Sequence, residues 1–182
     1  MNRVTRGVFG VIAVLAAGCA QPPNVFSTSV KGQSTIPGVP IPLPFSGAIP
    51  QVAGLGSLDF NQNQEFKNQG VTKDQVDSVE VMGITLRILS PTAQDYSFID
   101  SVKLSAKADG APQVLVAEKA NVQSLHLAAP NPTLTLDLRN PEIKPFVTAP
   151  SMSVMVEGTG RAPPTDTVIE ATMDLKVAAH VL

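Results

Sequence analysis

The single thiol of the chain belongs to Cys19, and its surroundings indicate which chemistry it serves. A thiolate is a nucleophile that can be acylated, oxidised or bound to a metal. Cys19 follows an apolar run of ten residues over 8–17, which comes after Arg3 and Arg6 and leads into Gly18. A basic start, a short apolar segment and a small-residue cleavage site are the three parts of an export signal. Ten residues are about half of the ~20 that span a bilayer as a helix, so we expect this segment to be removed.

The segment Leu15-Ala16-Ala17-Gly18-Cys19 resembles the lipobox of bacterial lipoproteins. Ala16 holds the place at which that family more often has leucine. The resemblance covers residues 1–19, and it implies that a diacylglyceryl group is attached to the Cys19 thiol and that residues 1–18 are then cut off. It also implies acylation of the new amino terminus. Two or more acyl chains hold a protein stably in a membrane, whereas one chain holds it only marginally.

The same resemblance bears on the location of the protein. The residue after the cysteine is Ala20 and not an aspartate. This pattern resembles lipoproteins that are sorted to the outer membrane. We therefore expect a lipid-anchored protein of the bacterial cell envelope, attached to the membrane through acyl chains on Cys19. The alternative is an ordinary secretory signal that is cut nearby and leaves Cys19 as a free thiol.

Few other residues have the types and spacing that catalysis or metal binding needs. His126 and His180 are the only histidines, and nothing in their spacing brings them together with carboxylates, so we expect no metal site. A Ser-His-Asp triad would have to use one of them, and no Gly-x-Ser-x-Gly motif is present. We expect the carboxylate pairs Asp74/Asp77 and Asp95/Asp100 to be surface charges. The sequence therefore predicts no enzyme activity and no cofactor.

Two proline-containing segments are the candidate binding regions. Residues 36–45 hold four prolines among apolar residues, and proline cannot donate to a central strand, so this segment is an extended loop or a sheet edge. It is either a loop strapped across the end of the core or a docking segment for a partner with an aromatic groove. Arg161 precedes Pro163 and Pro164, either in a tight loop or facing an anionic partner. Pro42, Phe45 and Arg161 are the predicted binding residues.

Composition sets the size and limits the class of partner. Removal of residues 1–18 from the 182-residue chain leaves 164, enough for one domain with its own core. Without Arg3 and Arg6 the 13 basic residues become 11 against 15 acidic ones, a net charge of −4. A mildly acidic chain without a basic run argues against nucleic acid as a partner. We expect a lipidated tether over 19–24 and a domain over 25–182 with a proline-rich loop over 36–50.

Apolar residues alternate along most of this domain, which predicts strands. In the run over 79–88 the alternation changes phase by one residue near Met82, as at a β-bulge. Asp109-Gly110 predicts a hairpin turn, and Pro91 ends a strand. The sequence places Leu125 and Leu127 in one strand, with His126 directed to solvent, and Leu134, Leu136 and Leu138 in another. The last run, over 169–177, is the most regular.

These patterns predict an all-β fold, an antiparallel immunoglobulin-like β-sandwich of about seven or eight strands with short helical turns. They diffusely resemble immunoglobulin-like and LEA-type β-sandwich domains. A strong anchor signal and a domain poor in catalytic groups favour a non-enzymatic structural or protein-interaction module of the envelope. The alternative is a module that binds a small apolar ligand or a lipid between its sheets. An envelope hydrolase would need His126 close to a serine or an aspartate.

Overall fold

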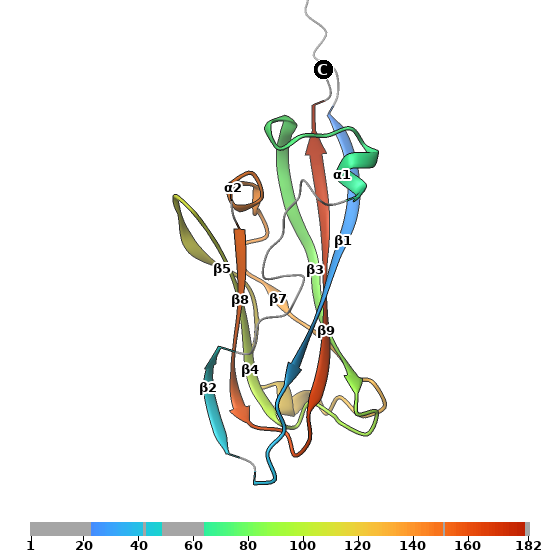
Figure 1. Ribbon diagram of the computed structural model, residues 1–182, viewed down its shortest axis with the longest axis vertical. Helices are drawn as coiled ribbons and strands as arrows, with labels where there is room; N and C mark the ends of the chain where they lie inside the picture. The colour runs from blue at the N-terminus through green and yellow to red at the C-terminus, as the bar shows by residue number, and fades with distance from the viewer. Residues whose placement is uncertain (1–22, 42, 49–63, 151, 181–182) are drawn as a thin grey trace, which may run out of the picture.

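The computed structural model describes residues 23–41, 43–48, 64–150 and 152–180. The described chain forms two antiparallel sheets (Figure 1), which confirms the prediction of an all-β antiparallel sandwich. The four-stranded sheet has the order β1 (Asn24–Ile36), β9 (Thr167–Ala179), β3 (Val76–Ser90), β6 (Thr133–Thr135). The five-stranded sheet has the order β2 (Pro44–Ala48), β8 (Met152–Arg161), β4 (Ile99–Ala108), β5 (Ala111–Lys119), β7 (Asp137–Leu138).

The last strand, β9, holds the four-stranded sheet together. It pairs along its whole length with β1 on one side and with β3 on the other. Its alternating sequence explains this position, because Ile169, Ala171, Met173, Leu175 and Val177 are all buried. A strand with one apolar and one polar face suits a sheet that covers a core on one side only.

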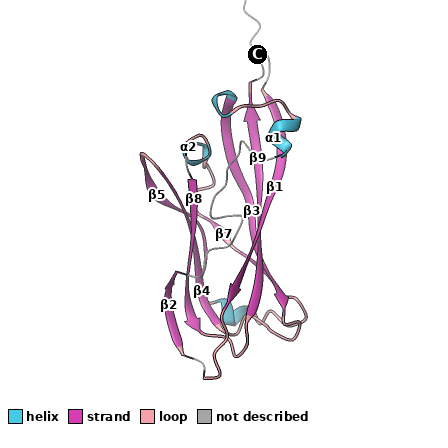
Figure 2. Cartoon of the chain, viewed as in Figure 1, coloured by secondary structure: helices cyan, strands magenta, loops and turns pink. Residues whose placement is uncertain are grey.

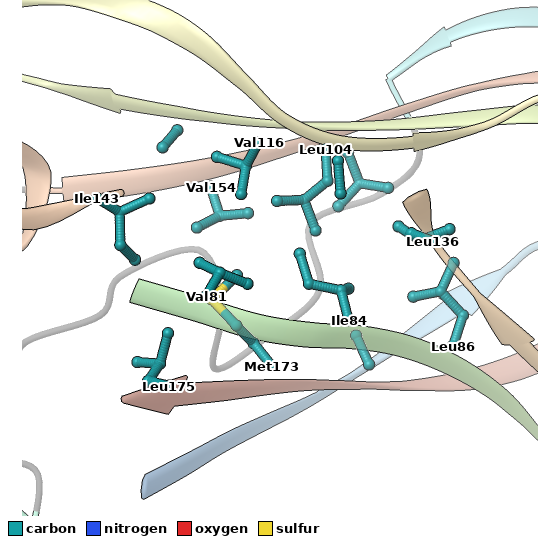
Figure 3. Close-up of a cluster of buried hydrophobic side chains, with 14 of the residues drawn as sticks. Val81, Ile84, Leu86, Leu104, Val116, Leu136, Ile143, Val154, Met173 and Leu175 are labelled. Atoms are coloured by element: carbon teal, nitrogen blue, oxygen red, sulfur yellow. The ribbon is translucent and has the colours of Figure 1, made fainter. Parts of the chain in front are cut away.

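The core lies between the two sheets. Figure 3 shows side chains of both sheets directed toward one another, among them Ile84 and Met173 from one sheet and Leu104 and Val154 from the other. These four side chains are buried. Close packing of this kind has to stabilise the domain, because the described residues contain no cysteine and hence no disulfide.

The predicted phase change in β3 is a β-bulge. Val81 pairs with Leu175 and Gly83 pairs with Asp174, so Met82 is an extra residue without a partner on β9. Met82 points outward and is exposed. The bulge allows the apolar residues before and after Met82 to face the same core although they differ in phase.

The alternating run at Leu134, Leu136 and Leu138 is not one strand, as the sequence predicted, but two. Leu134 pairs with Leu86 in the four-stranded sheet, whereas Leu138 pairs with Ala117 in the five-stranded sheet. Leu136 lies between them, and its N–H donates to Ile84 O at 3.0 Å. This crossing, together with the short edge strand β2, brings the described strands to nine instead of seven or eight.

The predicted strand around Leu125 and Leu127 is wrong. Val122–Leu125 is a 3-10 turn, η2, bounded by Asn121 and His126 in the left-handed backbone region (φ 53° and 47°). Alternation alone does not make a strand, and here the turn packs against β4.

The other helical segments are short, as Figure 2 shows. Thr72 and Gln75 form the capping box of a single 3-10 turn, in which Thr72 N–H donates to Gln75 Oε1 at 2.9 Å. The helical elements of the described chain are α1 (Gln64–Asn68), η1 (Lys73–Gln75), η2 and α2 (Lys144–Val147). None of the described helices is long and apolar enough to cross a membrane.

The sandwich has two different ends. At one, the terminal end, β1 begins and β9 finishes, because Asn24 pairs with Ala179. At the other, the distal end, Ile36 pairs with Thr167, and the β1–β2, β3–β4 and β8–β9 connections lie together (Figure 1). The candidate binding residues Phe45 and Arg161 are found at the distal end.

Candidate functional site

A proline-rich segment closes the distal end of the sandwich. We call residues 37–41 and 43 the strap. Val39 N–H donates to Pro163 O at 2.9 Å, and Ala162 N–H donates to Leu43 O at the same distance. Gly38 N–H donates to Asp166 Oδ1 at 2.8 Å. The strap is therefore bonded along the connection between β8 and β9.

Gly38 makes the closest approach in this contact. A Cβ atom built there would lie 2.2 Å from the carbonyl carbon of Thr165, so only glycine fits without a shift of the backbone. The strap continues into β2, an edge strand that pairs with β8 from Pro44↔Arg161 to Ala48↔Glu157. Proline at the first position of an edge strand costs no ladder hydrogen bond.

The strap presents apolar side chains to solvent. Ile41 is 73% exposed and Leu43 is 59% exposed, the two largest values among the large hydrophobic side chains of the described chain. Phe45 is half-buried and packs against the core. The two predicted binding residues Phe45 and Arg161 lie on the same strand pair, in which Arg161 pairs with Pro44 and Phe45 pairs with Gly160. Arg161 is exposed. Pro42 lies outside the described residues, as does Cys19.

A second feature of the distal end is a hollow of about 200 Å³ beside η2. It is lined by Asp95, Tyr96, Ser97, Val122, Gln123, His126, Leu127 and Ala128. Tyr96 is buried, its hydroxyl donates to Leu86 O at 2.6 Å, and burial raises the pKa of this hydroxyl. The hollow therefore has a fixed aromatic wall with no free hydroxyl.

The polar groups of this hollow are fixed by local hydrogen bonds. His126 Nδ1 lies 2.8 Å from Ser124 O, and Ser97 N–H donates to Asp95 Oδ1 at 3.0 Å. Hydrogen bonds from the Ser97 hydroxyl and N–H hold the pKa of Asp95 below its ordinary value of 3.8, although partial burial opposes them. Asp95 is therefore ionised at neutral pH.

The hydrolase hypothesis required His126 close to a serine or an aspartate, and the structure does bring it to the same hollow as Ser97 and Asp95. A triad needs the serine hydroxyl to hydrogen-bond the imidazole, and the imidazole to hydrogen-bond the carboxylate. Within the described part of the chain, Asp95 accepts hydrogen bonds from Ser97, and the imidazole of His126 contacts Ser124 O. The described hydrogen bonds therefore do not connect these three side chains as the hydrolase hypothesis requires.

The remaining candidates from the sequence lie apart from the distal end. His180 Nδ1 is 2.9 Å from Asp77 Oδ1 at the terminal end, and both side chains are about half exposed. Asp74 lies in the first turn of η1. The described residues hold no group of three or more histidine, cysteine, aspartate or glutamate side chains that could bind a metal ion.

Two further hollows are open depressions on the outer faces of the sheets. One, of about 220 Å³, lies over β2, β8 and β4, where Ser101 Oγ and Thr159 Oγ1 are 2.7 Å apart. The other, of about 540 Å³, lies over β1, β9 and the bulge at Met82. Both are flat and surrounded by solvent-exposed polar groups, whereas the hollow beside η2 is formed by two connections, β3–β4 and β5–β6, and has mostly apolar walls.

The sequence located the strap by its prolines, but it did not locate the hollow beside η2. Asp95 and His126 are 31 positions apart, and each was interpreted as a surface residue. One signal was present, because Asn121, His126 and Asn131 are polar residues of the kinds that most often adopt a positive φ, and all three do so here. Residues of this kind on both sides of a four-residue segment indicate a connection that is not a regular strand.

Comparisons with known proteins add little to this geometry. No protein-family model and no curated protein matches the chain. Among solved structures, the chain is similar to one titled Desmodium yellow mottle tymovirus, with 9% sequence identity and a TM-score of 0.35 over 94% of this chain and 97% of that one. A likeness at this level carries no argument about function.

Proposed function

We propose that this protein is a lipid-anchored lipoprotein of the bacterial cell envelope whose β-sandwich is a non-enzymatic module that binds another envelope protein at its distal end. The observation that carries the proposal is the position of Cys19, at the end of an export signal and five residues before β1 begins at Asn24. The acyl chains on Cys19 would hold the protein in the outer membrane.

The short tether determines how the sandwich is oriented. Five residues span at most about 18 Å when fully extended, so the terminal end would stay next to the bilayer. The 13 residues of β9 extend about 43 Å at 3.3 Å per residue. The distal end would therefore be presented far from the lipid surface, where a partner can reach it.

The strap supports an interaction role because it is rigid before binding. Three hydrogen bonds to residues 162–166 hold it, and its prolines limit its backbone, so little conformational entropy is lost when a partner binds. Exposed apolar side chains that a fold holds in place are typical of interaction surfaces. Proline-rich extended segments are recognised by grooves lined with aromatic side chains, and we propose such a groove on the partner.

The anchor is tested by a Cys19→Ser variant of the full chain. Serine keeps the size of the side chain but cannot form the thioether, so we expect the variant to leave the membrane fraction almost completely. Mass spectrometry of the mature wild type should show a diacylglyceryl-modified Cys19 at the amino terminus. A wild-type protein recovered soluble with an unmodified thiol would contradict the anchor, and so would a Cys19→Ser protein that stays in the membranes.

The interaction surface is tested by crosslinking in intact cells, with an Ile41→Ser/Leu43→Ser variant. Because Ile41 and Leu43 are the two most exposed large apolar side chains of the described chain, we expect the yield of the crosslinked partner to fall at least about tenfold. Val25→Ser is the matched control, since Val25 is also exposed (53%) but lies at the terminal end. Equal yields from all three proteins would contradict the proposed surface.

A further inference from the structure

We propose that the hollow beside η2 is a binding site for a primary alkylammonium group, either a free amine or the side chain of a lysine. This inference goes beyond the proposed function, since it concerns a different set of residues from the strap. It rests on the size of the hollow, on the chemistry of its walls and on the hydrogen bonds that orient its polar groups.

The size of the hollow limits the ligand. At about 200 Å³ it is smaller than the ~300–1,000 Å³ of sites that take drug-sized molecules. Val122, Leu127 and Ala128 provide aliphatic walls, and the ring of Tyr96 is buried and stacked on Phe98, with centroids 6.4 Å apart. A short aliphatic chain fits such walls, whereas a sugar or a nucleotide would leave most of its hydroxyls without partners.

The polar groups of the hollow are acceptors. The carboxylate of Asp95 accepts hydrogen bonds from the N–H and the hydroxyl of Ser97 and has further lone pairs. Gln123 Nε2 donates to Asp100 Oδ1 at 2.5 Å, which leaves Gln123 Oε1 as the free atom of that amide. An ammonium group has three donors and no acceptor, and it is complementary to such a set.

His126 contributes a third acceptor. Its Nδ1 contacts Ser124 O at 2.8 Å, and because a carbonyl oxygen can only accept, Nδ1 carries the proton. In the neutral ring, Nε2 is then an acceptor. The unusual backbone of this residue (φ 47°) is what brings the imidazole to the hollow after the 3-10 turn. Positive backbone angles on both sides of η2 are a local cost that functional sites often carry.

Charge favours a cation over a neutral donor. Within the described part of the chain, the three ion pairs involve Asp137, Glu118 and Asp77, so neither Asp95 nor Asp100 has a basic side chain as a partner. An ammonium group would supply the missing positive charge. A divalent metal ion is less suited, because the hollow offers one carboxylate and one imidazole and the rest of its donors are weak ligands.

The test is an NMR titration of the folded domain with n-butylammonium chloride at constant ionic strength. We expect saturable shifts of the amide signals of Ser97, Gln123 and Ala128, with a dissociation constant of about 1–10 mM, as is usual for so few atoms. n-Butanol, which has the same shape without the charge, should bind at least about tenfold more weakly. Equal binding of the alcohol would overturn the proposal, and so would an absence of saturable shifts with the amine.

Two variants localise the site. Asp95→Asn removes the charge but keeps an oxygen for Ser97 N–H, and we expect it to weaken butylammonium binding at least about tenfold. Asp174→Asn is the matched control, since Asp174 also accepts from a serine, Ser29, but lies on the outer face of the four-stranded sheet. Ala128→Leu, which fills the hollow from the apolar side, should abolish binding. Unchanged binding in Asp95→Asn, or an equal loss in Asp174→Asn, would overturn the assignment.

A second arm of the titration identifies the source of the amine. If the site takes a lysine side chain, Nα-acetyl-lysine amide should bind more tightly than butylammonium, because its backbone would contact the rim. If the site takes a free amine, butylammonium should bind more tightly. The strap variants change the yield of the crosslinked partner, whereas the variants of the hollow change the binding of the amine. The failure of this proposal can therefore be distinguished from the failure of the proposed function.

Discussion

Deletion of Thr85 is expected to reduce the free energy of unfolding by at least about 2–5 kcal/mol, whereas deletion of Met82, three positions away, should cost about 1 kcal/mol or less. Both residues lie on β3, and both deletions shorten the strand by one position. The difference arises from the bulge. Met82 is the extra residue, so its removal leaves Val81 and Gly83 paired with neighbouring residues of β9 in a continuous ladder.

Removal of Thr85 has no such solution. If the bulge is straightened to absorb the deletion, Gly83 moves to the inner face opposite Met173 and Ile84 moves to the outer face. Ile84 is fully buried, so the loss of its side chain from the core exposes it and leaves a cavity in its place. If the bulge is kept, the charged Arg87 faces the core. Burial of this charge would reduce the free energy of unfolding more than the loss of Ile84 from the core. Urea denaturation of the two deletion proteins checks this, and equal stabilities would show that β3 is not held in the register described.

Gly160→Ala is expected to cost about 3–5 kcal/mol in the free energy of unfolding. Gly160 lies on β8 between Phe45 of β2 and Ile99 of β4. Its φ is +157°, and a Cβ atom built there would lie 2.2 Å from Phe98 O and 3.0 Å from the Cα atom of Ile99. These are backbone atoms, so no side chain can rotate away to make room. The backbone of β4 is also fixed at this point, because Arg161 N–H donates to Phe98 O at 2.8 Å.

Gly83→Ala is the control for this substitution. Gly83 is also a strand glycine, but the nearest atom to a built Cβ is Asp174 Oδ2 at 3.9 Å, an ordinary van der Waals distance. We expect its unfolding free energy to change by no more than about 0.5 kcal/mol. Thermal or urea unfolding of the two variants measures the difference. A Gly160→Ala protein as stable as Gly83→Ala would mean that β8 and β4 do not approach as closely as described.

Several elements could be predicted from the sequence because their causes are local. The alternation of β9, the bulge at Met82, the hairpin at Asp109-Gly110 and the capping box at Thr72 each depend on residues within a few positions of one another. The prolines of the segment over 36–45 also act locally. A proline has no backbone N–H to donate to a neighbouring strand, so this segment could be excluded from the centre of a sheet. The hypothesis of a lipidated Cys19 also depends only on a short contiguous segment, and it stays a prediction.

Other features depend on which strands become neighbours, and no local pattern contains that information. Leu134 and Leu138 alternate as one strand would, yet they pair in different sheets, because β3 offers an edge to the first and β5 offers one to the second. Leu125 and Leu127 alternate too, but the chain forms a 3-10 turn over Val122–Leu125 and no strand there. Alternation shows that a segment can be half-buried, not which partner buries it.

The sequence by itself determined that the chain is all-β and that its proline-rich segment lies outside the centre of a sheet, and it led to the hypothesis of lipidation at Cys19. Only the tertiary structure decided that the strap lies on the distal end beside Arg161, and that Asp95, Gln123 and His126 line one hollow. The physical reason is the range of the interactions. Backbone geometry and hydrophobic alternation act between near neighbours in the chain, whereas a binding site is assembled from loops that only the packing of two sheets brings together.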